Sequence, residues 1–594
     1  MQAEIERRIG ELELAKRSFS EPDVVLALLA SLDRIDASAR SDRSDGSDRS
    51  GSGEWNAALL ARFHDALLFL CAYPATPKIL KRAESILGRF SRRVVALAHV
   101  EDLSPLLDQR FSGIAGTSIA TDFSYDVARW LVQRFPGHVG IDSEADAASD
   151  RLASILPSLF PFLDELSADA NIPYREWLAA ADPGAGDGGL AWLLGAIEGL
   201  LIPLAQRAAL YDSLGLVIDW RLGNSAMTRT RMRRLPPEIF YQQTPLLSRR
   251  DVEQMRQLRH EPLPVRRLSR WEGEEVLDLA RAVITTRYRE LYCFSWGDPA
   301  GIQSVNGGRG LEILLIGLLP EHRLPLRAGF GVLVLRNGVP IGYGDAYGLC
   351  ERMEVSFNIF YAFRDGESAF CFIRLLEIYH QLFGSTSFSI DPYQIGLGND
   401  EAIEAGAFWF YRKLGFRSTD PLIERTAVRE EQRMAADPRH RTSPRTLKKW
   451  AVSNLVLDLN DEEIDAPRRS RSRLVRHARG GDWDRFQVRN LGTKVGKAFA
   501  ARGESAAAFR DSTTKRIAAS LRIDVGSLTF SERRAFDRLA PVLALIPDLT
   551  RWTDDERSGL LEIVRVKTGR SEGKYLQLTA DHERLRRALI ALGR

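Results

Sequence analysis

Strand-like periodicity is confined to the middle of this 594-residue chain. The runs GLEILLIGLLP, GFGVLVLRNGVPIGYGDAYGL and MEVSFNIFYAF are rich in the branched and aromatic residues that favour strands. Asn337 and Gly338 separate two such runs, as in a tight β-hairpin. On both sides of this region apolar residues recur every three or four positions, which is typical of helices. The sequence therefore predicts a mixed sheet-and-helix domain between helical flanks.

After these strands the pattern alternates between helix and strand. A helix is expected from about Glu367 to Phe383, a strand over STSFSID, and a second helix from Asp400 into Leu414. Several strands in succession, then helix, strand, helix and strand, indicate a mixed layer rather than a doubly wound parallel sheet. The predicted fold class is α+β multidomain, with a central mixed α/β domain flanked by mostly helical N-terminal and C-terminal domains.

A chain of this length is expected to fold as several domains. The stretch ASARSDRSDGSDRSGSG has no large apolar side chain, so it cannot bury enough surface to offset the entropy of ordering. The boundaries expected from such shifts are a leading helical segment over 1–36, a linker over 37–53, a helical domain over 54–225, a connector over 226–265, the mixed domain over 266–424, a basic linker with helices over 425–480, and a C-terminal helical domain over 481–594.

Composition limits the classes of function. The formal net charge is +3, but the stretch from Pro438 to Arg594 has 33 Lys or Arg against 20 Asp or Glu, so the tail is the basic end. The four cysteines have no metal-ligand spacing, so no metal site is expected. The first residues lack the apolar core of a signal peptide, and the longest apolar stretch is broken by Glu198 and Pro203, so we expect no membrane span and a cytoplasmic protein.

The junction around residue 411 is the most informative local pattern. Asn399 precedes two acidic residues, which is typical of a helix N-cap with acids in the first turn. Phe410, Tyr411 and Leu414 continue one apolar face, and Gly415 ends the helix. This places Tyr411 at the edge of the buried face, close to the sheet. Taken alone, the pattern fits a core tyrosine with a satisfied hydroxyl.

The order of elements points to a known superfamily. NDEAIEAGAFWFYRKLGF resembles the closing motif of the GNAT superfamily of acyl-CoA-dependent N-acyltransferases, in which Asn, a small residue, Tyr and "LGF" recur at about this spacing. The hairpin GVLVLRNGVPIGYGDA resembles the second and third strands of that fold, and MEVSFNIFYAF resembles its fourth. The resemblance covers roughly residues 270 to 420, about a quarter of the chain.

The resemblance implies two catalytic roles. Tyr411 stands where the family often has a general acid that protonates the departing thiolate of coenzyme A. Glu354 stands early in the fourth strand, where some members have a general base that acts directly or through water. Such a pair suits the chemistry, because an amine nucleophile must lose a proton and a thiolate leaves more readily when it gains one. Glu354 also fits a solvated residue at the rim of a strand.

The resemblance also implies a binding turn for acetyl-CoA or another acyl-CoA in the stretch FRDGESAF. Two registers of the family motif bring in Arg364, Gly366, Ser368 and Ala369, and the closing motif adds Asn399. Asp365 and Glu367 place carboxylates at the helix terminus that should receive a pyrophosphate, which they would repel. An ordinary capped helix explains the same stretch without a ligand.

Three functions remain open on the sequence. The first is an N-acyltransferase that uses acyl-CoA or a related donor and the amine of a small molecule or peptide as acceptor. The second is a GNAT-like scaffold that has lost the cofactor and binds a partner protein, which the acidic turn and the large helical flanks favour. The third is nucleic-acid contact through the basic tail, but its aromatic residues Trp450 and Trp483 are isolated, so a solvated linker is favoured there.

Overall fold

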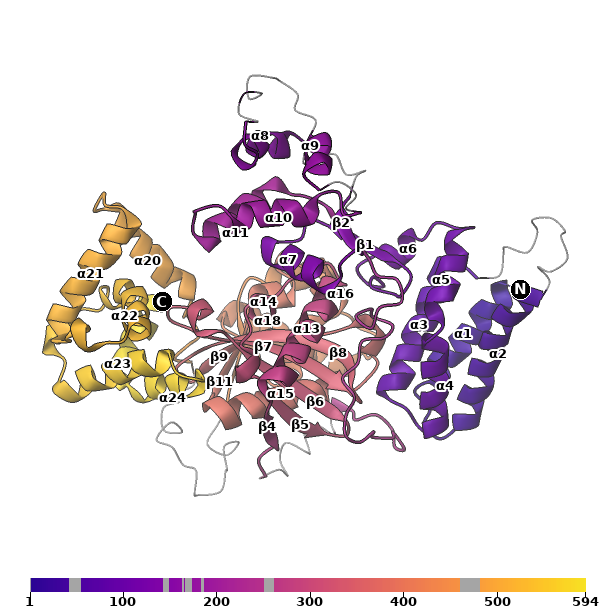
Figure 1. The fold of residues 1–594 in the computed structure, drawn as a ribbon. Helices are drawn as coiled ribbons and strands as arrows, with labels where there is room; N and C mark the ends of the chain where they lie inside the picture. Colours follow the sequence, from indigo (N-terminus) through magenta and orange to yellow (C-terminus); the bar gives the residue numbers. More distant parts are fainter. Residues whose placement is uncertain are drawn as a thin grey trace.

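The computed structural model describes residues 2–41, 55–142, 149–162, 165, 174–182, 186–249, 251, 261–459 and 481–594. Helical ends lie on both sides of a central multi-stranded sheet, as the sequence predicts (Figure 1). Most of the expected linker over 37–53 lies outside the described residues, and helix α2 continues to Ser41. The basic run APRRSRSRLVRHARGG also lies almost entirely outside them.

The N-terminal helices form a bundle beside one end of the sheet (Figure 1). Helix α3 is apolar around most of its circumference and buries nearly all of its side chains, as expected for the central helix of a bundle. It begins at an N-cap, Asn56, whose side chain accepts a hydrogen bond from the Leu59 amide. The helices of this bundle are α1 (Gln2–Ala15), α2 (Pro22–Ser41), α3 (Ala57–Ala72), α4 (Pro77–Leu87) and α5 (Phe90–Ala98).

The next segment adds a small sheet to the helical domain expected over 54–225. It contains a three-stranded antiparallel sheet in the order β1-β3-β2, packed through Trp220 against Trp130 and Phe135. These strands have three or four residues each, too few for a period-two pattern to stand out from the helices around them. The elements are α6 (Ser104–Leu107), β1 (Ser118–Thr121), α7 (Tyr125–Arg134), β2 (Val139–Ile141), α8 (Ser149–Leu159), α9 (Tyr174–Ala181), α10 (Leu190–Glu198), α11 (Leu204–Leu214) and β3 (Ile218–Arg221).

Among the described residues the central sheet has ten strands, in the order β12-β13-β11-β9-β8-β7-β6-β5-β4, with β10 paired to β8. The expected hairpin is confirmed, since Asn337 and Gly338 both have positive φ and join β7 to β8. The first part of the domain contains β4 (Val265–Arg267), α13 (Arg270–Thr285), α14 (Tyr292–Ser295), β5 (Gln303–Gly308), β6 (Leu311–Gly317), β7 (Ala328–Arg336), β8 (Val339–Leu349), β9 (Arg352–Val355) and β10 (Asn358–Ile359).

The second part of the domain confirms one expected helix and corrects another. The helix expected from about Glu367 is α15 (Ser368–Phe383), and STSFSID contains β11 (Ser387–Ile390). The helix expected from Asp400 into Leu414 is instead two short ones, α16 (Asp400–Glu404) and α17 (Ala407–Arg412). Gly406 between them has a φ of +68°, a left-handed conformation that cannot continue an α-helix. Tyr411 is therefore carried on a helix of its own.

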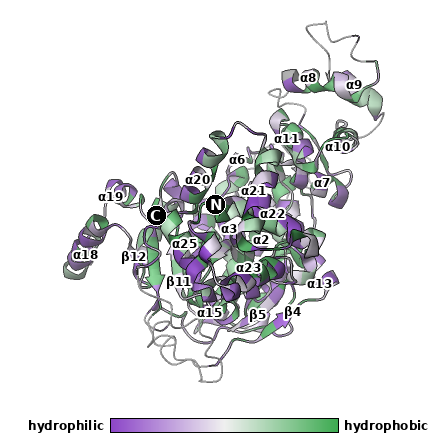
Figure 2. Cartoon of the chain, turned by 90° about the vertical axis from the view of Figure 1, so that its left-hand side faces the viewer, coloured by the Kyte–Doolittle hydropathy of each residue, from purple (hydrophilic) through white to green (hydrophobic). Residues whose placement is uncertain are grey.

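The strand that follows Gly415, β12 (Arg417–Ser418), lies at the edge of the sheet and pairs with β13 (Leu455–Asp458). The sequence predicted only linker and helices over 425–480, yet β13 lies between β11 and β12. Helices α18 (Pro421–Ala436) and α19 (Pro444–Trp450) extend from this edge, and α18 is largely hydrophilic (Figure 2). The remaining helices are α20 (Val488–Ala500), α21 (Ala506–Leu521), α22 (Phe530–Leu543), α23 (Asp554–Lys567), α24 (Gly573–Asp581) and α25 (Glu583–Gly593).

A buried ion pair joins the sheet to the C-terminal helices. Glu351, in the turn between β8 and β9, is 1% exposed and accepts hydrogen bonds from Arg586 Nε at 2.9 Å and from Trp483 Nε1 at 2.7 Å. Arg586 on α25 is 4% exposed and also reaches Asp482 at 2.9 Å. A charge buried in this way depends on its partner, because water cannot replace that partner.

We expect Glu351→Ala to lower the free energy of unfolding of the C-terminal helices by about 3–5 kcal/mol, because it leaves Arg586 without its closest carboxylate. Urea denaturation followed by circular dichroism measures the change. Glu274→Ala is the matched control, since its pair with Arg270 is solvent-exposed and should contribute less than about 1 kcal/mol. Equal effects of the two substitutions would show that the buried pair does not hold this junction.

Candidate functional site

The site begins where two parallel strands separate. Among the described strands of the central sheet, β9 and β11 form the only parallel pair, and their pairing ends at Glu354 and Ser389. Beyond that point the β9 chain continues as β10 along β8, with Asn358 opposite Tyr343. β11 instead turns away at Pro392. A gap in the strand pairing therefore opens after Glu354.

Tyr411 lies at this gap. Its ring packs among Phe372, Phe410 and Phe416, and its hydroxyl donates to the Phe357 carbonyl oxygen at 3.5 Å. The side chain is only 2% exposed, and this burial raises the pKa of Tyr411. The phenol therefore stays protonated across the physiological range and can act only as a proton donor there.

Glu354 lies on the other face of the sheet. Successive strand residues alternate between faces, so Glu354 shares a face with Tyr347 opposite it, whereas Phe357 faces α15 and packs on Phe372. The Glu354 carboxylate lies 3.2 Å from Arg327 and 3.7 Å from Arg352, and its side chain is 28% exposed. None of the described contacts joins it to Tyr411. The two predicted catalytic residues thus flank the strand from opposite sides.

The predicted cofactor turn at the start of α15 is covered by the N-terminal bundle. A Cβ placed on Gly366 would lie 2.5 Å from the Tyr73 hydroxyl, which accepts a hydrogen bond from the Glu367 amide. The Glu367 side chain is completely buried and pairs with Arg309 at 2.6 Å and with Arg336 at 3.0 Å. A pyrophosphate held here in the family's manner does not fit, because protein groups already occupy its place and one of them is a carboxylate.

The other predicted cofactor residues have structural partners or lie at the rim. Arg364 donates to Glu401 at 2.8 Å and stacks on Tyr361, with its guanidinium 3.7 Å from the ring centre. Asn399 caps α16 by accepting from the Ala402 amide at 3.1 Å, and it donates to the Tyr393 carbonyl. Ser368 and Ala369 form the first turn of α15 and are partly exposed.

A small basic pocket lies beside the gap, and sequence reasoning missed it. Its walls come from the segment after α6, the turn after α13, strands β8 and β10, the 3-10 helix η6 (Tyr361–Phe363) and α16. The polar residues that line it include Arg110, Arg287, Arg289, Tyr343, Asn358 and Glu401. They come from segments far apart in the sequence and share no motif. The one local signal is the basic pair Arg287 and Arg289 just after a helix end.

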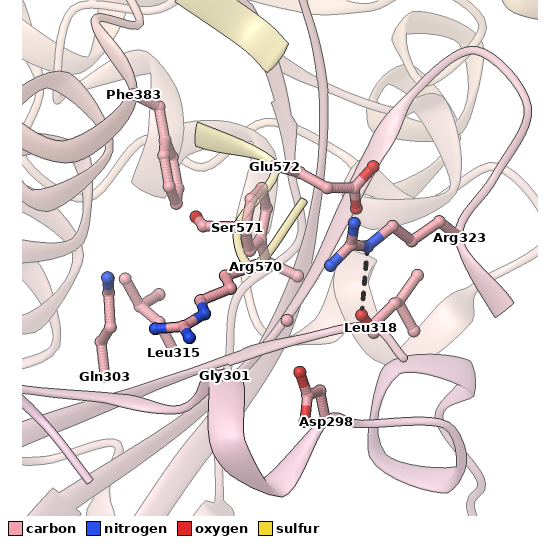
Figure 3. Close-up of a pocket in the computed structure, with 12 residues that line it drawn as sticks. Asp298, Gly301, Gln303, Leu315, Leu318, Arg323, Phe383, Arg570, Ser571 and Glu572 are labelled. Atoms are coloured by element: carbon pink, nitrogen blue, oxygen red, sulfur yellow. Dashed lines mark hydrogen bonds between the residues drawn. The ribbon is translucent and has the colours of Figure 1, made fainter. Parts of the chain in front are cut away.

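A second cavity lies between the sheet and the C-terminal helices (Figure 3). Arg570, Ser571 and Glu572, from the loop after α23, line it together with residues of β5, β6 and α15, and Arg323 Nε donates to the Leu318 carbonyl at 3.3 Å. Its volume of about 20 Å³ leaves room for about one water molecule. Neither Tyr411 nor Glu354 lines it, so we assign it no part in the site.

Comparison with protein-family models, curated proteins and solved structures finds no match to this chain. Within the described ranges no group of three or more His, Cys, Asp or Glu side chains could hold a metal ion. No helix in the same ranges is both long enough and apolar enough to cross a membrane.

Burial gives Tyr411 a testable pH dependence. Because its pKa is raised above the ordinary value near 10, the unfolded chain loses the phenol proton at a lower pH than the folded chain. The stability that neutral Tyr411 contributes is complete below about pH 10 and is lost as the pH rises through the raised pKa. We expect Tyr411→Phe to make the free energy of unfolding fall about 1.4 kcal/mol less per pH unit above about pH 10.

Urea denaturation at a series of alkaline pH values measures this slope. Tyr393→Phe is the control, because the Tyr393 side chain is exposed and should leave the slope unchanged. If Tyr411→Phe and Tyr393→Phe gave the same slope, Tyr411 would have to ionise freely in the folded protein.

Proposed function

We propose that residues 265–458 form an acyl-transfer domain of the GNAT type, which moves an acyl group to the amine of a small-molecule or peptide acceptor. The observation that carries the proposal is the separation of β9 from β11 next to the Tyr411 hydroxyl. Acyl-CoA thioesters are the donors that the resemblance implies. Three further features support the proposal: the hairpin of β7 and β8, the parallel pair of β9 and β11, and the crossover through α15.

Such a reaction needs two proton transfers, and we assign one to Tyr411 and the other to Glu354, which lie on opposite sides of β9. Tyr411 holds a proton on its hydroxyl oxygen and delivers it to the departing group of the donor. Glu354 accepts the proton that the acceptor amine loses, directly or through one water. Arg327 and Arg352 hold the Glu354 carboxylate in place near the end of the parallel pairing. The pyrophosphate of coenzyme A does not fit at α15, so no step of this proposal uses that terminus.

The catalytic role of Tyr411 is tested by turnover. With acetyl-CoA or longer acyl-CoAs and a panel of amines, we expect Tyr411→Phe to lower kcat by about 10²–10⁴-fold, because it removes the transferable proton. Release of the free thiol, followed with a chromogenic disulfide, measures the rate. Tyr393→Phe, an exposed tyrosine of the neighbouring turn, should leave kcat unchanged. Failure of every acyl-CoA to bind in titration calorimetry would contradict the proposal for this class of donor.

A second candidate is a GNAT-like scaffold that binds a partner protein and no cofactor. The contacts of Tyr73 and Glu367 favour it, because they close the terminus of α15 with groups of the same chain. The carboxylate neutralises Arg336, which is itself fully buried, so the contact stabilises the junction between α3 and the sheet. On this proposal the first turn of α15 serves the attachment of the N-terminal bundle.

Hydrogen exchange separates the two candidates. A scaffold predicts that acetyl-CoA leaves amide exchange over residues 360–370 unchanged, and that Glu367→Gln accelerates exchange in α3 around Tyr73 at least tenfold. Asp365→Asn is the control, because Asp365 is exposed and only loosely paired with Lys16 and Arg17 at 3.7 Å. Protection of residues 360–370 by acetyl-CoA would rule out the scaffold as described.

A further inference from the structure

The basic pocket beside the gap contains a buried guanidinium without a carboxylate partner. Arg287 is 7% exposed, and its Nη1 donates to the Val283 carbonyl. Its guanidinium lies 3.7 Å from the centre of the Phe360 ring. In the described part of the chain no carboxylate lies within 4.0 Å of it, and Asp65 behind it is already paired with Arg229 at 2.7 Å. The Val283 carbonyl and the Phe360 ring stabilise this buried charge in part, and an anion that entered the pocket would stabilise it further.

A hydroxyl donor faces the same pocket. The Tyr343 oxygen accepts hydrogen bonds from Arg289 Nη1 at 2.6 Å and from Asn358 Nδ2 at 3.3 Å. Because both lone pairs of that oxygen are used, the proton of Tyr343 points away from these donors. None of the described residues accepts it. The proton is thus available to an acceptor in the pocket.

The charges around the pocket are unbalanced. Glu401 is the one carboxylate of its lining, and it is shared between Arg289 and Arg364, each at 2.8 Å. Arg110 at the rim is exposed and stacks on Tyr361 at 4.5 Å. Three guanidinium groups of the lining, those of Arg110, Arg287 and Arg289, therefore face one carboxylate, a net charge of about +2 around one small opening. Burial lowers the pKa of Arg287, and the neighbouring Arg229 and Arg289 act in the same direction.

We propose that this pocket binds the anionic head group, a phosphate or a carboxylate, of a small-molecule ligand. Its volume of about 30 Å³ has room for one or two oxygen atoms, the part of a head group that would enter between the pocket walls. Arg287 and Arg110 supply the charge, and Tyr343 donates its free hydroxyl proton. The rest of the ligand would lie outside the pocket, whose β10 wall is formed by Asn358 and Ile359. That this ligand is the donor or the acceptor of acyl transfer rests on the proposed function, whereas the anion site does not.

Titration calorimetry on the full-length protein tests the site, with inorganic phosphate and acetate as probes at constant ionic strength. We expect saturable binding of at least one anion, weakened about tenfold by Arg287→Gln and several-fold by Arg110→Ala and by Tyr343→Phe. Arg270→Gln is the matched control, because Arg270 is an exposed arginine at the other end of α13. The preferred probe identifies the head group as a phosphate or a carboxylate.

Absence of saturable binding of both anions to the wild type would overturn the proposal. Equal binding by Arg110→Ala, Tyr343→Phe and Arg270→Gln would overturn it as well, and these variants decide the question if Arg287→Gln does not fold. The outcome is independent of the acyl-transfer assay. Anion binding without turnover would support the anion site and count against the proposed acyl transfer. Turnover without anion binding would support acyl transfer and overturn the anion site.

Discussion

The early end of the parallel pairing between β9 and β11 is the constraint on which the rest of this domain depends. A parallel pair requires a crossover, and α15 supplies it. Because β10 stays on β8 while β11 turns away, a short length of strand edge is left open in the middle of the sheet, where an edge is normally paired. The Tyr411 side chain covers that edge and satisfies the Phe357 carbonyl. The Tyr411 hydroxyl thus lies beside the centre of the sheet, while its ring stays packed among the aromatic residues of the core.

Two groups of arginines lie near this opening, and they differ in how their charge is balanced. Arg309 and Arg336 share the buried carboxylate of Glu367 and belong to the attachment of the N-terminal bundle. Arg287 and Arg110 have no such carboxylate and face a pocket. The chain has therefore filled one anion position with the buried side chain of Glu367 and left another open. The GNAT resemblance implies an anion at the start of α15, where the Glu367 carboxylate already lies. The positive charge of Arg287 and Arg110 instead favours an anion in the basic pocket.

The sequence predicted the features that depend on local pattern. The Asn337–Gly338 turn, α15 and β11 lie where alternation, helical spacing and turn residues placed them. Features that depend on distant partners were missed. The strand β13 joins the central sheet from beyond two helices, and the helix expected from Asp400 into Leu414 is broken at Gly406. The basic pocket combines Arg110 with residues more than 170 positions away. The closure of Gly366 by Tyr73 could not be predicted either, because packing between domains leaves no periodic signal in either segment.

The position of β13 limits where the chain can be shortened without removing a strand of the central sheet. The strand comes from residues 455–458, beyond helices α18 and α19, yet it is hydrogen-bonded on both sides within the sheet. A protein shortened after β12 would retain every motif of the GNAT resemblance and would still expose the backbone donors and acceptors of β11. Such a bare edge invites strand addition from a second molecule, so we expect the shortened protein to self-associate through β11. The autonomous folding unit is therefore longer than the segment that its sequence motifs define.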